Sequence, residues 1–117
     1  MEKLENLLLS PTALFRDAIR AIDSSRSKIA LVVDESRRLL GTVTDGDERR
    51  GILDGRPVTE AITLIMNPKP TVGRAGESTK KLLSRMKAKS LRHIPVLDAE
   101  GRLVGLETLE GLSHDTG

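Results

Sequence analysis

Residues 28–44 read KIALVVDESRRLLGTVT, and residues 92–108 repeat that pattern as RHIPVLDAEGRLVGLET. The two stretches align without a gap at a constant offset of 64 residues. A repeat of this length is a supersecondary unit that needs its copy to bury its apolar face, so we predict a pseudo-symmetric pair with a ligand site at the seam. Identical residues occupy the aligned positions Val32/Val96, Asp34/Asp98, Arg38/Arg102, Leu39/Leu103, Gly41/Gly105 and Thr44/Thr108.

In the first copy, hydrophobic periodicity predicts the order helix, strand, strand, helix. Apolar residues recur at helical spacing over residues 14–22, and Thr12 is a suitable N-cap. Residues 29–33 form a short, mostly β-branched apolar run, which is typical of a buried strand. A turn joins that run to a second strand over residues 38–44, and a further helix follows over residues 45–53.

The second copy repeats these elements after a restart at Thr71. A helix is predicted over residues 78–86, and a hairpin is formed by strands over residues 93–97 and 102–106. The last helix has only residues 109–113, so we expect the chain to be a fragment of a longer protein.

The predicted fold is therefore α/β (α+β), with two pseudo-symmetric β-α-β-β-α repeats packed as one module. The first repeat, with a helical lead-in, covers residues 1–57. An inter-repeat connection covers residues 58–70, and the second repeat covers residues 71–117.

Composition restricts the possible partners and the setting of the protein. The formal net charge of the 117 residues is +2, and Phe15 is the single aromatic residue, which argues against nucleic-acid binding. The chain has no cysteine, and no apolar run approaches the ~20 residues of a membrane span. Residues 1–5 have mixed charge and do not resemble a signal peptide. We therefore expect a cytoplasmic protein with neither nucleic acid nor membrane as a partner.

The segment Gly41-Thr42-Val43-Thr44-Asp45-Gly46-Asp47 lies where a predicted strand turns into a helix. Backbone N–H groups at a helix N-terminus favour an anion, and the Thr44 hydroxyl adds a donor. The Asp47 carboxylate only accepts hydrogen bonds, which suits it to the paired hydroxyls of a ribose. These groups together predict a nucleotide site. The alternative is that Thr44 and Asp47 only cap the helix.

Basic side chains occupy corresponding strand entries in the two copies. Lys28 precedes the first buried strand, and Arg92 and His93 lie at the start of the equivalent strand. Such side chains could reach a phosphate across the pseudo-twofold axis. The alternatives are a solvated surface lysine and a hydrogen-bonded structural histidine.

Metal binding and catalysis are not predicted. The acidic run 45–48 looks like a metal loop, but it lacks the twelfth-position ligand and sixth-position glycine of a calcium loop. The chain also offers no convincing set of nucleophile, general acid and general base. We therefore expect neither a metal nor a required cofactor.

The repeated motifs resemble those of a known family. Each copy has an apolar strand ending in aspartate, such as residues 94–98, and a glycine seven residues further on. Gly41, Thr44 and Asp47 then match the pattern Gly-x-x-Thr/Ser-x-x-Asp. Over residues 7–112 the chain resembles a tandem pair of cystathionine-β-synthase (CBS) domains, often called a Bateman module.

This resemblance implies clefts between the repeats that bind AMP, ADP, ATP or S-adenosylmethionine. By position, Asp47 would hold the ribose and Thr44 the phosphate. Thr108 is a partial counterpart in the second copy, where Gly111 replaces the acid, so we expect one competent cleft and one weak or empty one. The family often has basic residues just before the second strand that contact the phosphates. In this chain those positions are occupied by Lys28, Arg92 and His93.

The resemblance also implies regulation rather than catalysis. Such modules commonly form homodimers and control an attached enzyme, channel or transporter. This chain is similar to the N-terminal module of certain sugar nucleotidyltransferases, so we expect an attached catalytic domain. The alternative function is a structural dimerisation module that binds no ligand.

Overall fold

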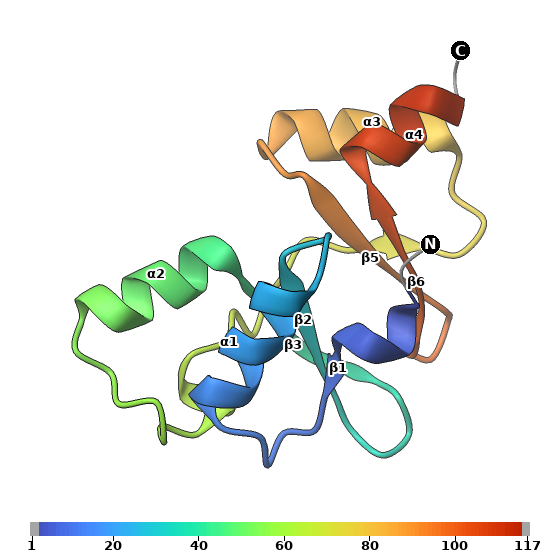
Figure 1. The fold of residues 1–117 in the computed structure, drawn as a ribbon. Helices are drawn as coiled ribbons and strands as arrows, with labels where there is room; N and C mark the ends of the chain where they lie inside the picture. The colour runs from blue at the N-terminus through green and yellow to red at the C-terminus, as the bar shows by residue number, and fades with distance from the viewer. Residues whose placement is uncertain (1–2, 116–117) are drawn as a thin grey trace. The chain divides into compact units, whose positions relative to one another are not determined.

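The computed structural model describes residues 3–115, which divide into two compact units (Figure 1). The first unit ends at Pro70 and the second begins at Thr71. Within the described residues, each unit consists of a three-stranded sheet and two α-helices. No helix of this part of the chain has the length and apolar composition needed to cross a membrane.

The first unit has the strand order β1-β2-β3, with β1 parallel and β3 antiparallel to the central β2. Short 3-10 helices lie before β1 and after α2. In chain order the elements are η1 (Leu4–Leu7), β1 (Leu8–Leu9), α1 (Phe15–Ser24), β2 (Ile29–Val33), β3 (Leu39–Thr44), α2 (Asp45–Leu53) and η2 (Ile62–Leu64).

The second unit repeats this topology with the order β4-β5-β6. Its strand pairing matches that of the first unit residue for residue: Ile29 pairs with Thr44, and His93 pairs with Thr108. The predicted β-α-β-β-α repeat is thus confirmed, including its offset. The elements are β4 (Gly73–Arg74), α3 (Thr79–Ala88), β5 (His93–Leu97), β6 (Leu103–Thr108) and α4 (Leu109–Asp115).

Identical aspartates shape the two hairpin turns. Asp34 Oδ1 accepts hydrogen bonds from the backbone N–H groups of Ser36 and Arg38, both at 2.9 Å. Asp98 Oδ1 accepts from the equivalent positions, Glu100 at 2.9 Å and Arg102 at 2.8 Å. An aspartate that holds its own following turn explains why this residue recurs in both copies.

The start of α1 differs from the prediction. Thr12 is not the N-cap: its hydroxyl is hydrogen-bonded to the Ser10 hydroxyl at 2.9 Å, and the helix begins only at Phe15. Leu14 is extended and pairs with Ala61 in an isolated β-bridge, which delays the helix. The Asp17 carboxylate instead accepts from the Leu14 N–H at 2.8 Å.

The core of the first unit includes a residue from the segment expected to be a connection. Ile62 is fully buried, and its N–H donates to the Ala13 carbonyl at 2.9 Å. Asn67 exchanges two backbone hydrogen bonds with Thr42 on β3. The rest of the buried cluster is contributed by Ala18, Ile22, Ala30, Val32 and Val43.

Close packing against Phe15 positions α2, the helix that follows Thr44. Phe15 on α1 is fully buried, and a Cβ added to Gly51 on α2 would lie 2.8 Å from Phe15 Cζ. A larger residue at position 51 would therefore force the two helices apart. Figure 1 shows α2 in green beside α1 in blue.

The second unit has its own core and an ion pair that links two of its segments. Leu82, Met86 and Ile94 are buried together with Leu112 of α4. The Arg85 guanidinium makes two hydrogen bonds to the Glu77 carboxylate, at 2.8 and 2.6 Å, and a third to the Val72 carbonyl. This pair joins α3 to the segment that carries β4.

Candidate functional site

Thr44 and Asp47 meet at the junction of β3 and α2. Thr44 is the N-cap of α2, and its Oγ1 accepts from the Asp47 N–H at 3.2 Å. In return, Asp47 Oδ2 accepts from the Thr44 N–H at 2.9 Å and from the Thr44 hydroxyl at 3.1 Å. This reciprocal capping box stabilises the first turn. The two residues therefore do cap the helix, and their nucleotide-binding role stays a prediction.

The second oxygen of Asp47 has a partner that the sequence analysis did not consider. Asp47 Oδ1 forms an ion pair with Arg50 Nη2, one helical turn further on. The Asp47 side chain is 15% exposed, whereas that of Arg50 is 70% exposed. The i, i+3 spacing of acid and base is the sequence signal that could have predicted this contact.

Lys28 lies at the entry to β2 with a left-handed backbone, at φ 55°. Its N–H donates to Ser25 Oγ at 3.0 Å, and its ammonium donates to the carbonyls of Ile22 and Asp23, each at 3.3 Å. Those carbonyls belong to the C-terminal end of α1, where a cation is favourable. In this structure the charge of Lys28 is thus directed at α1, and its phosphate contact stays a prediction.

The remaining predicted residues come together in the second unit. His93 on β5 is opposite Thr108 on β6, and the Arg92 carbonyl accepts from the Leu109 N–H at 2.9 Å. Thr108 Oγ1 accepts from the Gly111 N–H at 2.9 Å, as Thr44 does from Asp47. Because Gly111 has no carboxylate, the second junction lacks the reciprocal half of the capping box.

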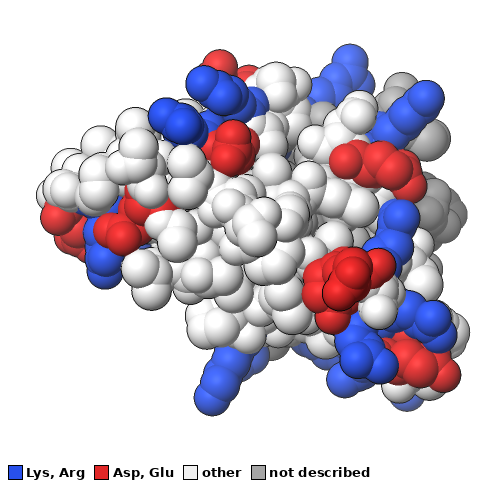
Figure 2. Space-filling model, turned by 90° about the horizontal axis from the view of Figure 1, so that it is seen from below, with Lys and Arg blue, Asp and Glu red and all other residues white. Residues whose placement is uncertain are grey.

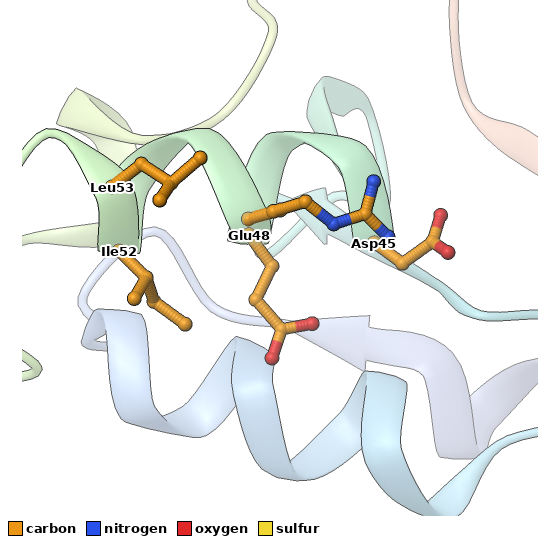
Figure 3. A pocket seen from close by; sticks show the side chains of 5 residues that line it. Asp45, Glu48, Ile52 and Leu53 are labelled. Atoms are coloured by element: carbon orange, nitrogen blue, oxygen red, sulfur yellow. The ribbon is translucent and has the colours of Figure 1, made fainter.

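A pocket of about 280 Å³ is lined by side chains of α2 other than that of Asp47 (Figure 3). In the figure, the Glu48 carboxylate points from α2 toward α1. Burial, and then the charges of Asp23 and Asp45, raise the pKa of Glu48 above its usual value. Sequence analysis did not anticipate this pocket, whose lining includes neither Thr44 nor Asp47 and consists of Asp45, Glu48, Arg49, Ile52 and Leu53.

The surface charges are mixed. Figure 2 shows Lys and Arg side chains beside Asp and Glu side chains, with uncharged surface between them, on the face that is drawn. This pattern contrasts with the single-sign basic patch that is typical of nucleic-acid-binding surfaces. Among residues 3–115, no group of three His, Asp or Glu side chains is placed to hold a metal ion.

Comparison with known proteins places these repeats in a family. The family model of the CBS domain matches residues 5–47 and again residues 58–106. A CBS domain protein from Pyrobaculum aerophilum, solved in complex with AMP, superposes with a TM-score of 0.81 at 20% identity, covering 90% of this chain and 81% of that one. CBSX2, also in complex with AMP, gives a TM-score of 0.81 at 23% identity, with 99% and 91% covered.

Curated relatives include enzymes that are much longer than this chain. A probable arabinose 5-phosphate isomerase of Haemophilus influenzae is 33% identical over 98 residues, which is 82% of this chain but 29% of the relative. This relative is a different class of enzyme from the predicted sugar nucleotidyltransferase. With both of its repeats matched by the family model, the chain belongs to the CBS domain family and is a tandem CBS pair, a regulatory rather than a catalytic module.

Proposed function

We propose that this CBS pair binds an adenosine nucleotide at the β3–α2 junction and thereby regulates an attached enzyme domain. The observation that carries the proposal is the pairing of Thr44 and Asp47 at the N-terminus of α2. The AMP complexes of structurally similar CBS proteins support the ligand class. AMP, ADP and ATP fit this class directly, and S-adenosylmethionine shares its adenosine moiety.

The two oxygens of Asp47 suit different tasks. Oδ2 is held by the Thr44 backbone and hydroxyl, which orients the carboxylate. Oδ1 is held only by the exposed Arg50 among its described contacts, so it is the oxygen available to accept from a ribose hydroxyl. The phosphate would then lie near the positive end of the α2 dipole and the Thr44 hydroxyl.

In the second unit we propose a weaker site or none. His93 is opposite Thr108 and Arg92 precedes β5 there, so these three residues are the candidates for a phosphate contact. Gly111 supplies no carboxylate for a ribose, and loss of a charged hydrogen bond weakens binding strongly. One competent site per chain is therefore expected.

The attached domain is proposed from the relatives. The chain covers only 29% of the Haemophilus influenzae relative, and we propose that the activity regulated by this CBS pair belongs to an attached domain. A sugar-phosphate isomerase domain is the candidate that this similarity favours, and a sugar nucleotidyltransferase domain stays a prediction. We also propose that the protein is a cytoplasmic homodimer.

Isothermal titration calorimetry with AMP, ADP, ATP and S-adenosylmethionine tests the site. Asp47→Ala is expected to weaken binding by about 10- to 100-fold, because a charged hydrogen bond contributes roughly 1.5–3 kcal/mol. Unchanged affinity in this variant would show that Asp47 does not hold the ligand.

Asp17→Ala is the matched control, because Asp17 has the same capping position in α1. Its carboxylate accepts from the Leu14 N–H at 2.8 Å and pairs with Arg20 at 3.8 Å. Both variants lose a cap and an i, i+3 ion pair, but only Asp47 lies at the proposed site. Equal losses of affinity would mean that the effect comes from folding rather than from ligand contact.

A structural dimerisation module without ligand is the second candidate. Gly111 favours it, because the second junction lacks the carboxylate that the first one has. A ligand that prefers the native state must raise the melting temperature. A flat thermal-shift panel together with a dimeric mass in solution would support this candidate against nucleotide sensing.

A further inference from the structure

Arg50 reaches back along α2 to the proposed nucleotide site. Its Nη2 forms the ion pair with Asp47 Oδ1, and a Cβ built on Gly46 would lie 3.7 Å from its Nη1. The same Cβ would lie 3.6 Å from Thr44 Oγ1. The guanidinium therefore lies over the first turn of the helix, beside the capping box.

This location is unusual for a cation. The N-terminal end of a helix carries partial positive charge, which disfavours a guanidinium. Arg50 is 70% exposed, and its ion pair with Asp47 compensates for the unfavourable position. Because the Arg50 side chain is mostly in solvent, the guanidinium stays hydrated when it leaves Asp47, and a ribose hydroxyl can replace it at the mostly buried carboxylate.

We propose that Arg50 makes the site selective for phosphorylated nucleotides over the free nucleoside, an inference that rests on the proposed function. In the free protein the guanidinium occupies Asp47 Oδ1. A ribose hydroxyl that binds this oxygen displaces Arg50, which then pairs with the phosphate near the N-terminus of α2. Adenosine displaces Arg50 and offers no phosphate in exchange, whereas AMP offers one.

The test compares the dissociation constants of adenosine and AMP for the wild-type chain, Arg50→Gln and Arg49→Gln. Arg49 is the matched control. It is an exposed arginine of the same helix, it lines the pocket of Figure 3 rather than the proposed site, and its replacement changes the net charge equally. Calorimetry at fixed ionic strength gives each constant, and circular dichroism verifies that both variants are folded.

In Arg50→Gln, adenosine is expected to bind about two- to fivefold more tightly, because no ion pair has to be broken. AMP is expected to bind about threefold more weakly, because its phosphate loses a charged partner. The preference for AMP over adenosine should thus fall by about tenfold, and Arg49→Gln should leave it within about twofold of wild type.

Two results would overturn this role for Arg50. One is an unchanged preference for AMP in Arg50→Gln, and the other is an equal fall in both variants, which would indicate a general charge effect. Failure of the wild-type chain to bind either ligand contradicts the proposed function and, with it, this inference. Binding of both ligands with an unchanged preference contradicts the role of Arg50 alone.

Discussion

Replacing Ile62 by alanine tests whether the segment after α2 is part of the first unit's core. Ile62 is fully buried, and its neighbours come from α1, β2 and β3. The substitution removes three buried carbon groups, each contributing about 0.8 kcal/mol on transfer from water. Adding the cavity left behind, we expect the free energy of unfolding to fall by about 3–4 kcal/mol.

Ile52→Ala is the control because it makes the same chemical change at an exposed position. The Ile52 side chain on α2 is 54% exposed, and alanine has the higher helix propensity. Its expected cost is below about 1 kcal/mol. Urea unfolding followed by circular dichroism measures both, with the m-value used to verify that the cooperativity is unchanged. If the two variants differ by less than about 1 kcal/mol, Ile62 does not have the core role described for it.

Two further perturbations follow from close contacts in the two units. The Arg85 guanidinium, and then the Arg74 backbone N–H, lower the pKa of Glu77 to about 2 from its ordinary 4.5. The unfolded chain therefore takes up this proton first, so wild-type stability should fall as the pH drops from about 4.5 toward 2. Glu77→Gln should flatten that part of the curve in urea titrations at stepped pH, and superimposable curves would contradict the assignment. Gly41→Ala should destabilise by about 1–3 kcal/mol, because its Cβ would lie 2.6 Å from Met66 Sδ and 2.8 Å from a backbone oxygen. Gly105→Ala has no atom within 4 Å of the new Cβ and should change the melting temperature little, so equal shifts for the two glycines would refute this explanation.

The secondary structure could be predicted because its signals are local. The apolar run 29–33 is bounded by polar residues, and β2 covers the predicted residues. Because residues 93–97 repeat residues 29–33, the same prediction applied to them, and β5 lies there. The hairpin turns followed in the same way, since each aspartate bonds to backbone groups two and four residues further on.

The candidate site was only partly accessible from sequence. Thr44 and Asp47 are three residues apart at a strand-to-helix junction, so their capping box is a local arrangement. The position of Lys28 next to a strand did not show where its charge would go. Its ammonium donates hydrogen bonds to carbonyls at the C-terminal end of α1. Only the path of the loop between α1 and Lys28 brings those carbonyls within reach.

By itself the sequence determined the two repeats, their strand and helix order, and the residues at each β–α junction. These features depend on periodicity and on contacts between near neighbours, which a pattern of residues expresses directly. Only the tertiary structure decided that Ile62 joins the first core and that Leu14 pairs with Ala61 and delays α1. Such contacts depend on which backbone groups and side chains meet after the chain has folded, and residue spacing does not encode that meeting.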